Sequence, residues 1–306
     1  MRKILLFVLV FLLIPTSASS RTQSLQVKSE PLSIYYFEHA AYDCGRLLSL
    51  SINETQKGEV SDFYSSLFSN GGEILFIPMY HSFYKDGSDF KTPYSIKVSD
   101  FEDELSILTK LQFMPVSVDM VYYYVKCGMK IPERAVLLTF DDGYNTFEEV
   151  YHLIKKYKFR GVLSIMTGYI DASWALSKGQ IKEIEKDGLI QFASHTHTLH
   201  NNFRNALEKK QYLNIEEDIQ RSREFFDEEH IKSYAFTYPQ GKGTDDAKLR
   251  KILSNYGFKM GFTLWKEYHI KPRSDPFAVS RIEISKRNKN YSKEQFRRFL
   301  LEYLGQ

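Results

Sequence analysis

The chain alternates between short apolar runs and amphipathic stretches from about residue 73 onward. The apolar runs predict strands at 74–79, 115–118, 135–140, 161–167, 189–194, 233–238, 259–264 and 278–284. Helical periodicity separates several of these runs, and one stretch places Phe147, Val150, Tyr151 and Ile154 on a single face. This alternation predicts an α/β fold, either a parallel barrel or a doubly wound sheet.

Three of the predicted helices begin with a capping-box pattern. In such a box, the first side chain accepts a backbone N–H bond and the second returns one. The pairs are Ser99 with Glu102, Asn145 with Glu148, and Ser177 with Gln180. We therefore expect these three helices to start at or just after the first residue of each pair.

The first 72 residues do not share this alternation. Residues 1–18 start with Arg2 and Lys3, continue as an unbroken apolar run and end in small residues, which is the layout of a secretory signal peptide. The run is too short to cross a bilayer as a helix, so a retained membrane anchor is the weaker interpretation. We expect residues 19–72 to form a linker with a short helical extension, and residues 73–306 to form the catalytic domain.

The composition is that of a folded globular protein, with 43% hydrophobic and 26% charged residues. The net charge is only +3 and no basic stripe stands out, so a nucleic-acid partner is not expected. The 21 Tyr and 23 Phe indicate either an aromatic core or rings that line a sugar-binding groove. The two cysteines, Cys44 and Cys127, lack metal-binding spacing and could pair in an oxidising compartment. No pattern indicates an oligomeric state.

Two adjacent carboxylates follow the predicted strand at 135–140. Asp141 and Asp142 come directly after it, followed by Gly143. Side chains at the carboxyl ends of barrel strands face the active site. Gly143 would let the chain turn so that both carboxylates reach this end, where a divalent cation would relieve their repulsion. One carboxylate could then bind the metal while the other accepts a proton, although an ordinary Asp-Asp-Gly turn has the same sequence.

Three of the eight histidines follow the predicted strand at 189–194. They are His195, His197 and His200. A separation of five residues would point two imidazoles apart on a helix, so the pattern favours a loop that folds back at the strand end. His195, His200 and one carboxylate would leave coordination positions open, as catalytic zinc sites do. These donors suit zinc, and cobalt, nickel or iron accept the same ligands.

These motifs resemble those of the polysaccharide deacetylase superfamily, carbohydrate esterase family 4, over residues 75–284. The resemblance is greatest to its branch of poly-β-1,6-N-acetylglucosamine N-deacetylases. It implies a distorted (β/α)7-type barrel and a secreted, metal-dependent enzyme that removes N-acetyl groups from an N-acetylglucosamine polymer at the cell surface or in a biofilm. By this resemblance Asp141 is the general base, and the metal ligands are Asp142, His195 and His200.

The resemblance implies further roles for residues outside these two motifs. His81 corresponds to the general acid of this branch, although a histidine at a strand end can also lack any role. The backbone N–H of Gln240 corresponds to the oxyanion donor, with Gln in place of the Tyr that the relatives carry. The wider family has an arginine in the motif that here spans residues 236–241, and this chain has none there.

Three supporting residues complete the expected site. Arg281 is a candidate for orienting Asp141 in place of the missing arginine. His197 is expected to contact the metal ligands without binding the metal itself, or to serve a structural role. Trp265 would form a wall of the sugar pocket or pack in the core. Other functions stay open at this point: a peptidoglycan or chitin-oligomer deacetylase, a non-catalytic glycan-binding relative, or an amidase of small molecules.

Overall fold

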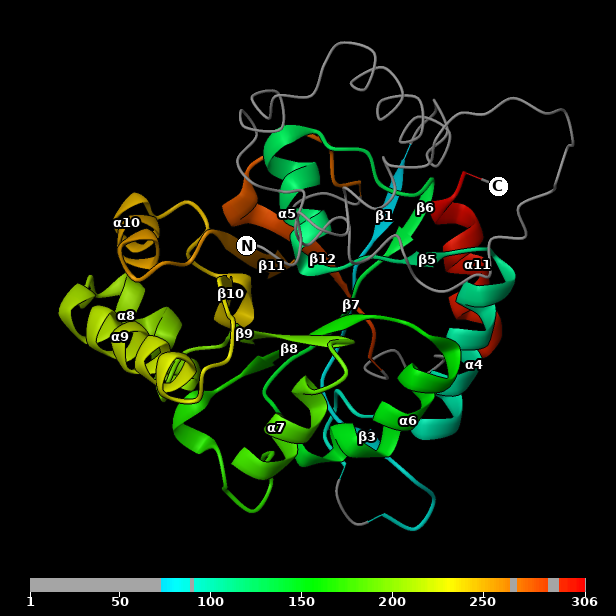
Figure 1. Ribbon diagram of the computed structural model, residues 1–306, viewed down its shortest axis with the longest axis horizontal. Coiled ribbons are helices and arrows are strands. Elements are labelled where there is room, and N and C mark those ends of the chain that lie inside the picture. The colour runs from blue at the N-terminus through cyan, green and yellow to red at the C-terminus, as the bar shows by residue number, and fades with distance from the viewer. Residues whose placement is uncertain (1–72, 89–90, 265–268, 286–291, 306) are drawn as a thin grey trace, which may run out of the picture. The chain divides into compact units, whose positions relative to one another are not determined.

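The computed structural model describes residues 73–88, 91–264, 269–285 and 292–305. These residues form a closed barrel of seven strands, all of whose pairs are parallel (Figure 1). In order around the barrel the strands are β2 (Pro78–Tyr80), β7 (Leu138–Phe140), β8 (Gly161–Ile165), β9 (Ile190–Ser194), β10 (Ala235–Thr237), β11 (Met260–Leu264) and β12 (Val279–Glu283). Each barrel strand pairs with the next one along the chain and β12 closes onto β2, so the predicted (β/α)7-type barrel is confirmed.

Two small parallel sheets lie beside the barrel. The first contains β1 (Ile74–Phe76), β6 (Arg134–Val136) and β5 (Met114–Pro115), and the second contains β3 (Phe83–Tyr84) and β4 (Ile96–Lys97). The predicted strands at 74–79 and 135–140 are therefore each divided, at Ile77 and Leu137. Their first halves belong to the side sheet and their second halves to the barrel. Pro78 has no N–H to donate, which suits a break at this position.

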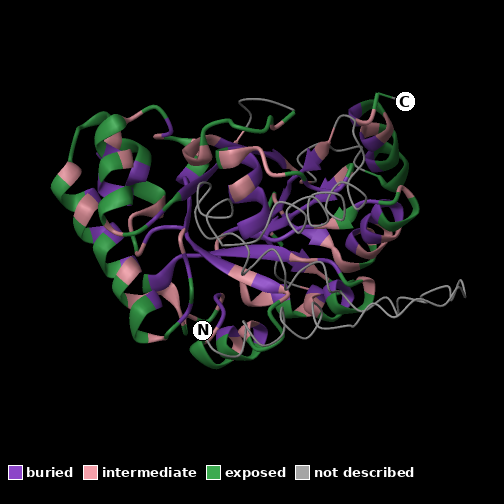
Figure 2. Cartoon of the chain, turned by 45° about the horizontal axis from the view of Figure 1, so that its top comes forward, coloured by how far each residue is buried: buried purple, intermediate pink, exposed green. Residues whose placement is uncertain are grey.

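Helices connect the barrel strands and cover them with their apolar faces. They are α4 (Val98–Lys110), α5 (Val118–Cys127), α6 (Glu148–Tyr157), α7 (Lys178–Glu185), α8 (Phe203–Glu208), α9 (Tyr212–Glu228), α10 (Ala247–Asn255) and α11 (Lys293–Tyr303). On α6, for example, Val150, Leu153 and Ile154 are buried. Burial is concentrated on the strands and on the helix faces that meet them (Figure 2).

One predicted strand and two predicted helix starts are wrong. Of the predicted run at 115–118, only Pro115 belongs to a strand, β5 (Met114–Pro115). The run ends early because Ser117 caps α5 by accepting a bond from the N–H of Met120. Helix α4 begins at Val98, one residue before Ser99, so Ser99 is not its cap. Asn145 instead starts a short 3-10 helix, and its side chain donates to the carbonyl of Ser173.

The third predicted cap is confirmed. Ser177 accepts a bond from the N–H of Gln180, whose side chain accepts a bond from the N–H of Ser177. This reciprocal pair satisfies two N–H groups at the start of α7 that would otherwise lack partners.

Much of the aromatic content belongs to the core. Tyr80, Phe101 and Phe140 are fully buried. The rings of Tyr80 and Phe101 meet edge to face with centroids 5.1 Å apart, and those of Phe140 and Phe147 with centroids 4.9 Å apart. Such pairs add stability beyond the area that they bury. These rings pack between barrel strands and helices, as expected for an aromatic core.

Several predictions concern residues outside the described part of the chain. These are the signal peptide and extension within residues 1–72, and the side chains of Cys44 and Trp265. Within the described residues, no helix is long and apolar enough to cross a membrane.

Candidate active site

The two adjacent carboxylates, Asp141 and Asp142, directly follow β7 and lie in different surroundings. The N–H of Asp141 donates to the carbonyl of Tyr80 at 2.8 Å, so Asp141 continues the barrel's hydrogen bonding. Asp142 and Gly143 then both take a φ of 73°, which turns the chain away from the strand direction. A Cβ on Gly143 would lie 3.0 Å from a methyl group of Ile165, so this close approach favours glycine. The turn thus breaks the side-chain alternation that would otherwise send the two carboxylates to opposite faces.

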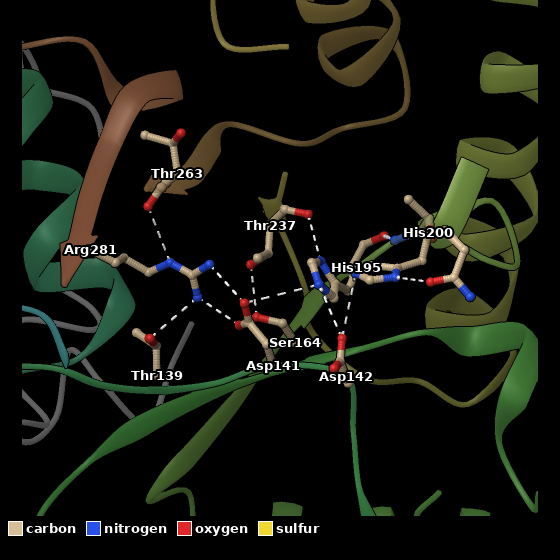
Figure 3. A network of polar contacts seen from close by, with 12 residues as sticks. Thr139, Asp141, Asp142, Ser164, His195, His200, Thr237, Thr263 and Arg281 are labelled. Atoms are coloured by element: carbon tan, nitrogen blue, oxygen red, sulfur yellow. Dashed lines mark hydrogen bonds and ion pairs between the residues drawn. The ribbon is translucent and has the colours of Figure 1, made fainter. Parts of the chain in front are cut away.

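Asp141 is held by Arg281, a buried arginine on β12, the strand that closes the barrel onto β2. Both guanidinium nitrogens of Arg281 donate to it, Nη1 to Oδ1 at 2.6 Å and Nη2 to Oδ2 at 2.8 Å (Figure 3). Arg281 is 1% exposed and Asp141 4% exposed. Arg281 also donates to the hydroxyl of Thr139 and the carbonyl of Thr263. This two-bond geometry fixes the plane of the carboxylate as well as its position.

Asp142, His195 and His200 bring three donor atoms to one point. Oδ1 of Asp142 lies 3.5 Å from Nε2 of His195 and 3.6 Å from Nε2 of His200 (Figure 3). All three atoms lie within 4.8 Å of one another. Donors about 2.0–2.2 Å from a shared ion are roughly 3.3–3.6 Å apart in a tetrahedral site. The two distances to Asp142 therefore fit a shared metal ion and are longer than those of ordinary hydrogen bonds.

The hydrogen bonds of this group leave the same three atoms free. Oδ1 of Asp142 is buried and has no hydrogen-bond partner among the described residues. Nδ1 of His195 faces the carbonyl of Thr237 at 2.8 Å, and Nδ1 of His200 faces the side-chain oxygen of Asn201 at 3.2 Å. These oxygens accept, so each Nδ1 carries the proton and each Nε2 presents its lone pair. The residues present therefore fit a divalent metal ion.

The charges in this group favour a cation. Burial alone would raise the pKa of Asp141, but Arg281 and His195 outweigh it and hold that pKa below its ordinary value. Burial likewise opposes ionisation of Asp142, yet His195 lowers the pKa of Asp142. Burial lowers the pKa of His195, but the carboxylates of Asp142 and Asp141 raise it overall. Burial and the nearby His195 lower the pKa of His200. Two buried carboxylates with one arginine leave a negative environment for the imidazoles.

His81 lies beside the two carboxylates but is not one of the three donors. It follows β2, and its charge lowers the pKa of both Asp141 and Asp142 after the larger effects of burial and the nearer groups. Its ring packs on that of Tyr94, with centroids 4.7 Å apart. Its Nδ1 is buried without a hydrogen-bond partner among the described residues. His81 is therefore within electrostatic reach of the group and held in place by packing.

A row of aromatic rings next to this group was not predicted from the sequence. The ring of Tyr144 lies 5.4 Å from that of Trp174, which lies 5.6 Å from that of Tyr169. A bridge between Tyr144 and Ala175 and a bond from the N–H of Asn145 to the carbonyl of Trp174 join the loops after β7 and β8. Burial and a hydrogen bond to Asp142 raise the pKa of Tyr144 to about 12, so its hydroxyl stays protonated. The three rings are only half-buried, which leaves them available to a ligand.

The remaining predicted residues lie near the group in different ways. Gln240 is exposed and has a φ of 54°, three residues after Thr237, whose carbonyl binds His195. Nδ1 of His197 lies 3.0 Å from the hydroxyl of Thr167, and His197 is not one of the three donors. Trp265 lies outside the described residues, so its predicted role is not tested by the structure.

Known proteins of similar sequence are deacetylases, and one family model matches part of the chain. Residues 128–261 match the polysaccharide deacetylase family. The chain is 29% identical to the poly-β-1,6-N-acetyl-D-glucosamine N-deacetylase of Staphylococcus aureus strain N315, over 93% of each chain. The corresponding protein of Staphylococcus epidermidis is 27% identical, over 80% of this chain and 81% of its own.

Two solved structures show the same barrel. IcaB from Ammonifex degensii matches with a TM-score of 0.60 and 24% identity, covering 70% of this chain and 93% of its own. The Streptococcus pyogenes deacetylase PplD matches with a TM-score of 0.63 and 22% identity, covering 76% and 99%.

The fold and the donor atoms together are typical of a metal-dependent hydrolase built on a (β/α)7-type barrel. Residues 128–261 match the polysaccharide deacetylase family and the relatives that align over most of the chain are N-deacetylases, which confirms the resemblance of the strand-end motifs and an N-deacetylase activity. Metal dependence is general in this family, and the group of Asp142, His195 and His200 is suited to hold the ion.

Proposed function

We propose that this chain removes N-acetyl groups from poly-β-1,6-N-acetylglucosamine outside the cell. The observation that carries the chemistry is the convergence of Oδ1 of Asp142 with Nε2 of His195 and Nε2 of His200. The substrate is suggested by the staphylococcal relatives, whose names specify this polymer and whose similarity extends over most of the chain.

Asp142, His195 and His200 would hold the metal ion, which we propose to be zinc, with cobalt, nickel or iron as alternatives. When bound, a divalent cation polarises the acetyl carbonyl and lowers the pKa of water. The two histidines are preset for this task, because their Nδ1 protons are already engaged by protein oxygens. No reorganisation of their rings is needed.

Asp141 would act as the general base and His81 as the general acid. Oδ2 of Asp141 lies 4.0 Å from Nε2 of His195, which leaves it within reach of a water molecule at the site. The lowered pKa of Asp141 keeps this carboxylate deprotonated before the reaction, which is the state that a general base requires. Arg281 orients this carboxylate, which leaves less conformational freedom to lose during the reaction. His81 would then donate a proton to the departing nitrogen, because without it the nitrogen would have to leave as an amide anion, which is a poor leaving group.

The backbone N–H of Gln240 would help to stabilise the oxyanion, since a backbone donor does not depend on the side chain. The half-buried rings of Tyr144, Trp174 and Tyr169 would line the sugar-binding surface. His197 would support the loop of the ligands through its bond with Thr167. Trp265 is proposed as a second wall of the pocket.

The domain organisation of the proposal follows from the sequence pattern. Residues 1–18 would be a signal peptide, residues 19–72 a linker with a short extension, and residues 73–306 the catalytic domain. Secretion would give the enzyme access to a polymer outside the cell, and the relatives are named for deacetylating poly-β-1,6-N-acetyl-D-glucosamine. Activity would therefore take place at the cell surface or in the surrounding polymer.

The proposed function is tested by acetate release from defined oligomers. Purified, zinc-loaded protein is incubated with β-1,6-linked and β-1,4-linked N-acetylglucosamine oligomers of equal length and with peptidoglycan fragments. We expect metal-dependent release that is fastest on the β-1,6-linked oligomers. Faster release from β-1,4-linked oligomers or peptidoglycan would replace the substrate and keep the chemistry. Binding without any release, at full metal occupancy, would contradict the chemistry and favour a glycan-binding protein.

A further inference from the structure

The loop between His195 and His200 is held in a strained conformation. Thr196 has a φ of 75°, which is a genuine outlier for a β-branched residue. Its side chain is fully buried, and its Oγ1 has no hydrogen-bond partner among the described residues. A conformation of this kind persists only where the surrounding structure holds it. The surroundings of this loop therefore determine where its histidines point.

A buried carboxylate on α9 holds one side of the loop. Oδ2 of Asp218 accepts the N–H of His197 at 2.7 Å. Oδ1 of Asp218 accepts the N–H of Thr198 at 2.7 Å and that of Leu199 at 2.8 Å. Asp218 is only 7% exposed. Three charge-assisted bonds to consecutive backbone groups make it a strong anchor for this loop.

The loop is also fastened from the side of β8. The N–H of Thr167 donates to the carbonyl of Thr196 at 3.2 Å, and the N–H of Gly168 donates to that of His197 at 3.0 Å. A Cβ on Gly168 would lie 2.5 Å from the methyl group of Thr198, so this contact requires a glycine. The strained turn is thus enclosed between β8 and α9, and Asp218 is its anchor on the α9 side.

We infer that Asp218 is a positioning residue that sets the metal affinity of the site through His200. His195 has its own supports, because its N–H donates to the carbonyl of Ile165 at 2.9 Å and its ring to that of Thr237. His200 follows directly after Leu199, whose N–H ends on Asp218. Without this anchor the turn relaxes, and Nε2 of His200 moves out of reach of the shared metal. The inference rests on the proposed metal site but on no particular substrate.

The test is the zinc affinity of an Asp218→Asn protein. Asparagine keeps the shape of the side chain but replaces one acceptor oxygen with an NH2 group, which opposes a backbone N–H. We expect the dissociation constant for zinc, measured by competition with a chromogenic chelator, to rise about 10- to 100-fold. The increase in Tm on adding a fixed zinc concentration should shrink as well. Asp218→Ala should show a larger loss, and if it does not fold, Asp218→Asn decides.

Glu217→Gln is the matched control, because Glu217 precedes Asp218 on the same helix and its side chain is 62% exposed. This variant should bind zinc as tightly as the wild type. A folded Asp218→Asn protein whose zinc affinity is within twofold of the wild type overturns the inference. So does a Tm of this variant that lies below the wild-type Tm by the same amount with and without zinc. A wild-type protein that binds no zinc, cobalt, nickel or iron would overturn the proposed function instead.

Discussion

The two ends of the barrel both contain buried polar side chains, but those around Gln191 at the amino-terminal end pair with one another, whereas atoms around Asp142 at the other end lack partners within the described part of the chain. At the amino-terminal end, the amide of Gln191 accepts the N–H of Val118 and donates to Asp119 at 2.9 Å. Asp119 also accepts the hydroxyl of Tyr234 at 2.7 Å and pairs with Lys232 at 3.7 Å. This network joins α5 to β9 and β10. Its groups satisfy one another, as buried polar groups usually do.

The carboxyl-terminal end is the opposite. Buried polar atoms of His81, Asp142 and Thr196 have no hydrogen-bond partner among the described residues. Asp142, Thr196 and Gln240, which follow β7, β9 and β10, all have positive φ. Strained backbone and unpartnered polar atoms lower stability, so their presence together around Asp142 and His195 indicates a ligand. The closed network therefore stabilises the barrel, whereas the unpartnered groups at the other end are available to a ligand.

The largest expected effect is the loss of a metal ligand. His200→Ala should reduce metal content below about a tenth of the wild type and lower turnover more than roughly 1,000-fold, since the cation supplies the central electrostatic stabilisation. Metal is measured by elemental analysis and turnover by acetate release. His152→Ala, on the exposed face of α6, is the control and should change neither quantity. A fully metallated, active His200→Ala protein would reject the ligand set.

The Asp141–Arg281 pair lies at the carboxyl-terminal end, but its two groups satisfy each other's hydrogen bonds as in the network around Gln191. Asp141→Asn should lower turnover by about 100- to 10,000-fold with near-normal metal content, because a general base is lost. The same change strands the buried guanidinium of Arg281 and should lower the free energy of unfolding by about 3–5 kcal/mol. Turnover comes from acetate release and stability from urea unfolding.

A double variant separates these two effects. Asp141→Asn combined with Arg281→Met removes both charges and should regain much of the unfolding free energy while staying inactive. Loss of bound metal in the single variant would contradict the role of Asp141 as base, because it would then be needed as a ligand.

Asp119→Ala tests the closed network. It removes the acceptor of both Gln191 and Tyr234, which should lower the free energy of unfolding by about 2–4 kcal/mol. The zinc affinity of the folded protein should not change. Tyr234→Phe removes a single hydroxyl and should lower the free energy by about 1 kcal/mol. Urea unfolding and chelator competition measure the two quantities, and a shifted zinc affinity would mean that the two ends are coupled.

The smallest effect is expected at the aromatic row. Trp174→Ala should raise KM about fivefold and leave kcat within twofold, because a ring contact is worth about 1 kcal/mol. Trp174→Phe keeps an aromatic face and should retain most of the affinity. Steady-state kinetics on β-1,6-linked oligomers gives both constants. An unchanged KM in the alanine variant would remove Trp174 from the sugar-binding surface.

The sequence predicted the parts of the fold and site that depend on local order. Strand–helix alternation indicated a parallel barrel or a doubly wound sheet, and the family resemblance favoured the barrel, whose observed strands lie within or close to the predicted runs. Asp142 and His200 could be proposed as metal ligands because each follows an apolar strand, and parallel strands bring their carboxyl ends to one side. The break at Leu137 was not visible, because an apolar run reads the same whether one strand or two consecutive strands use it.

The tertiary structure alone decided the contacts between distant segments. Arg281 lies 140 residues from Asp141 along the chain, and their double hydrogen bond exists because β12 closes the barrel next to β2. Asp218 looks like any polar residue of an amphipathic helix until α9 packs against the histidine loop. Trp174 approaches Tyr144 only because two loops pair. Local periodicity records which face of an element is buried, whereas these contacts depend on which elements become neighbours.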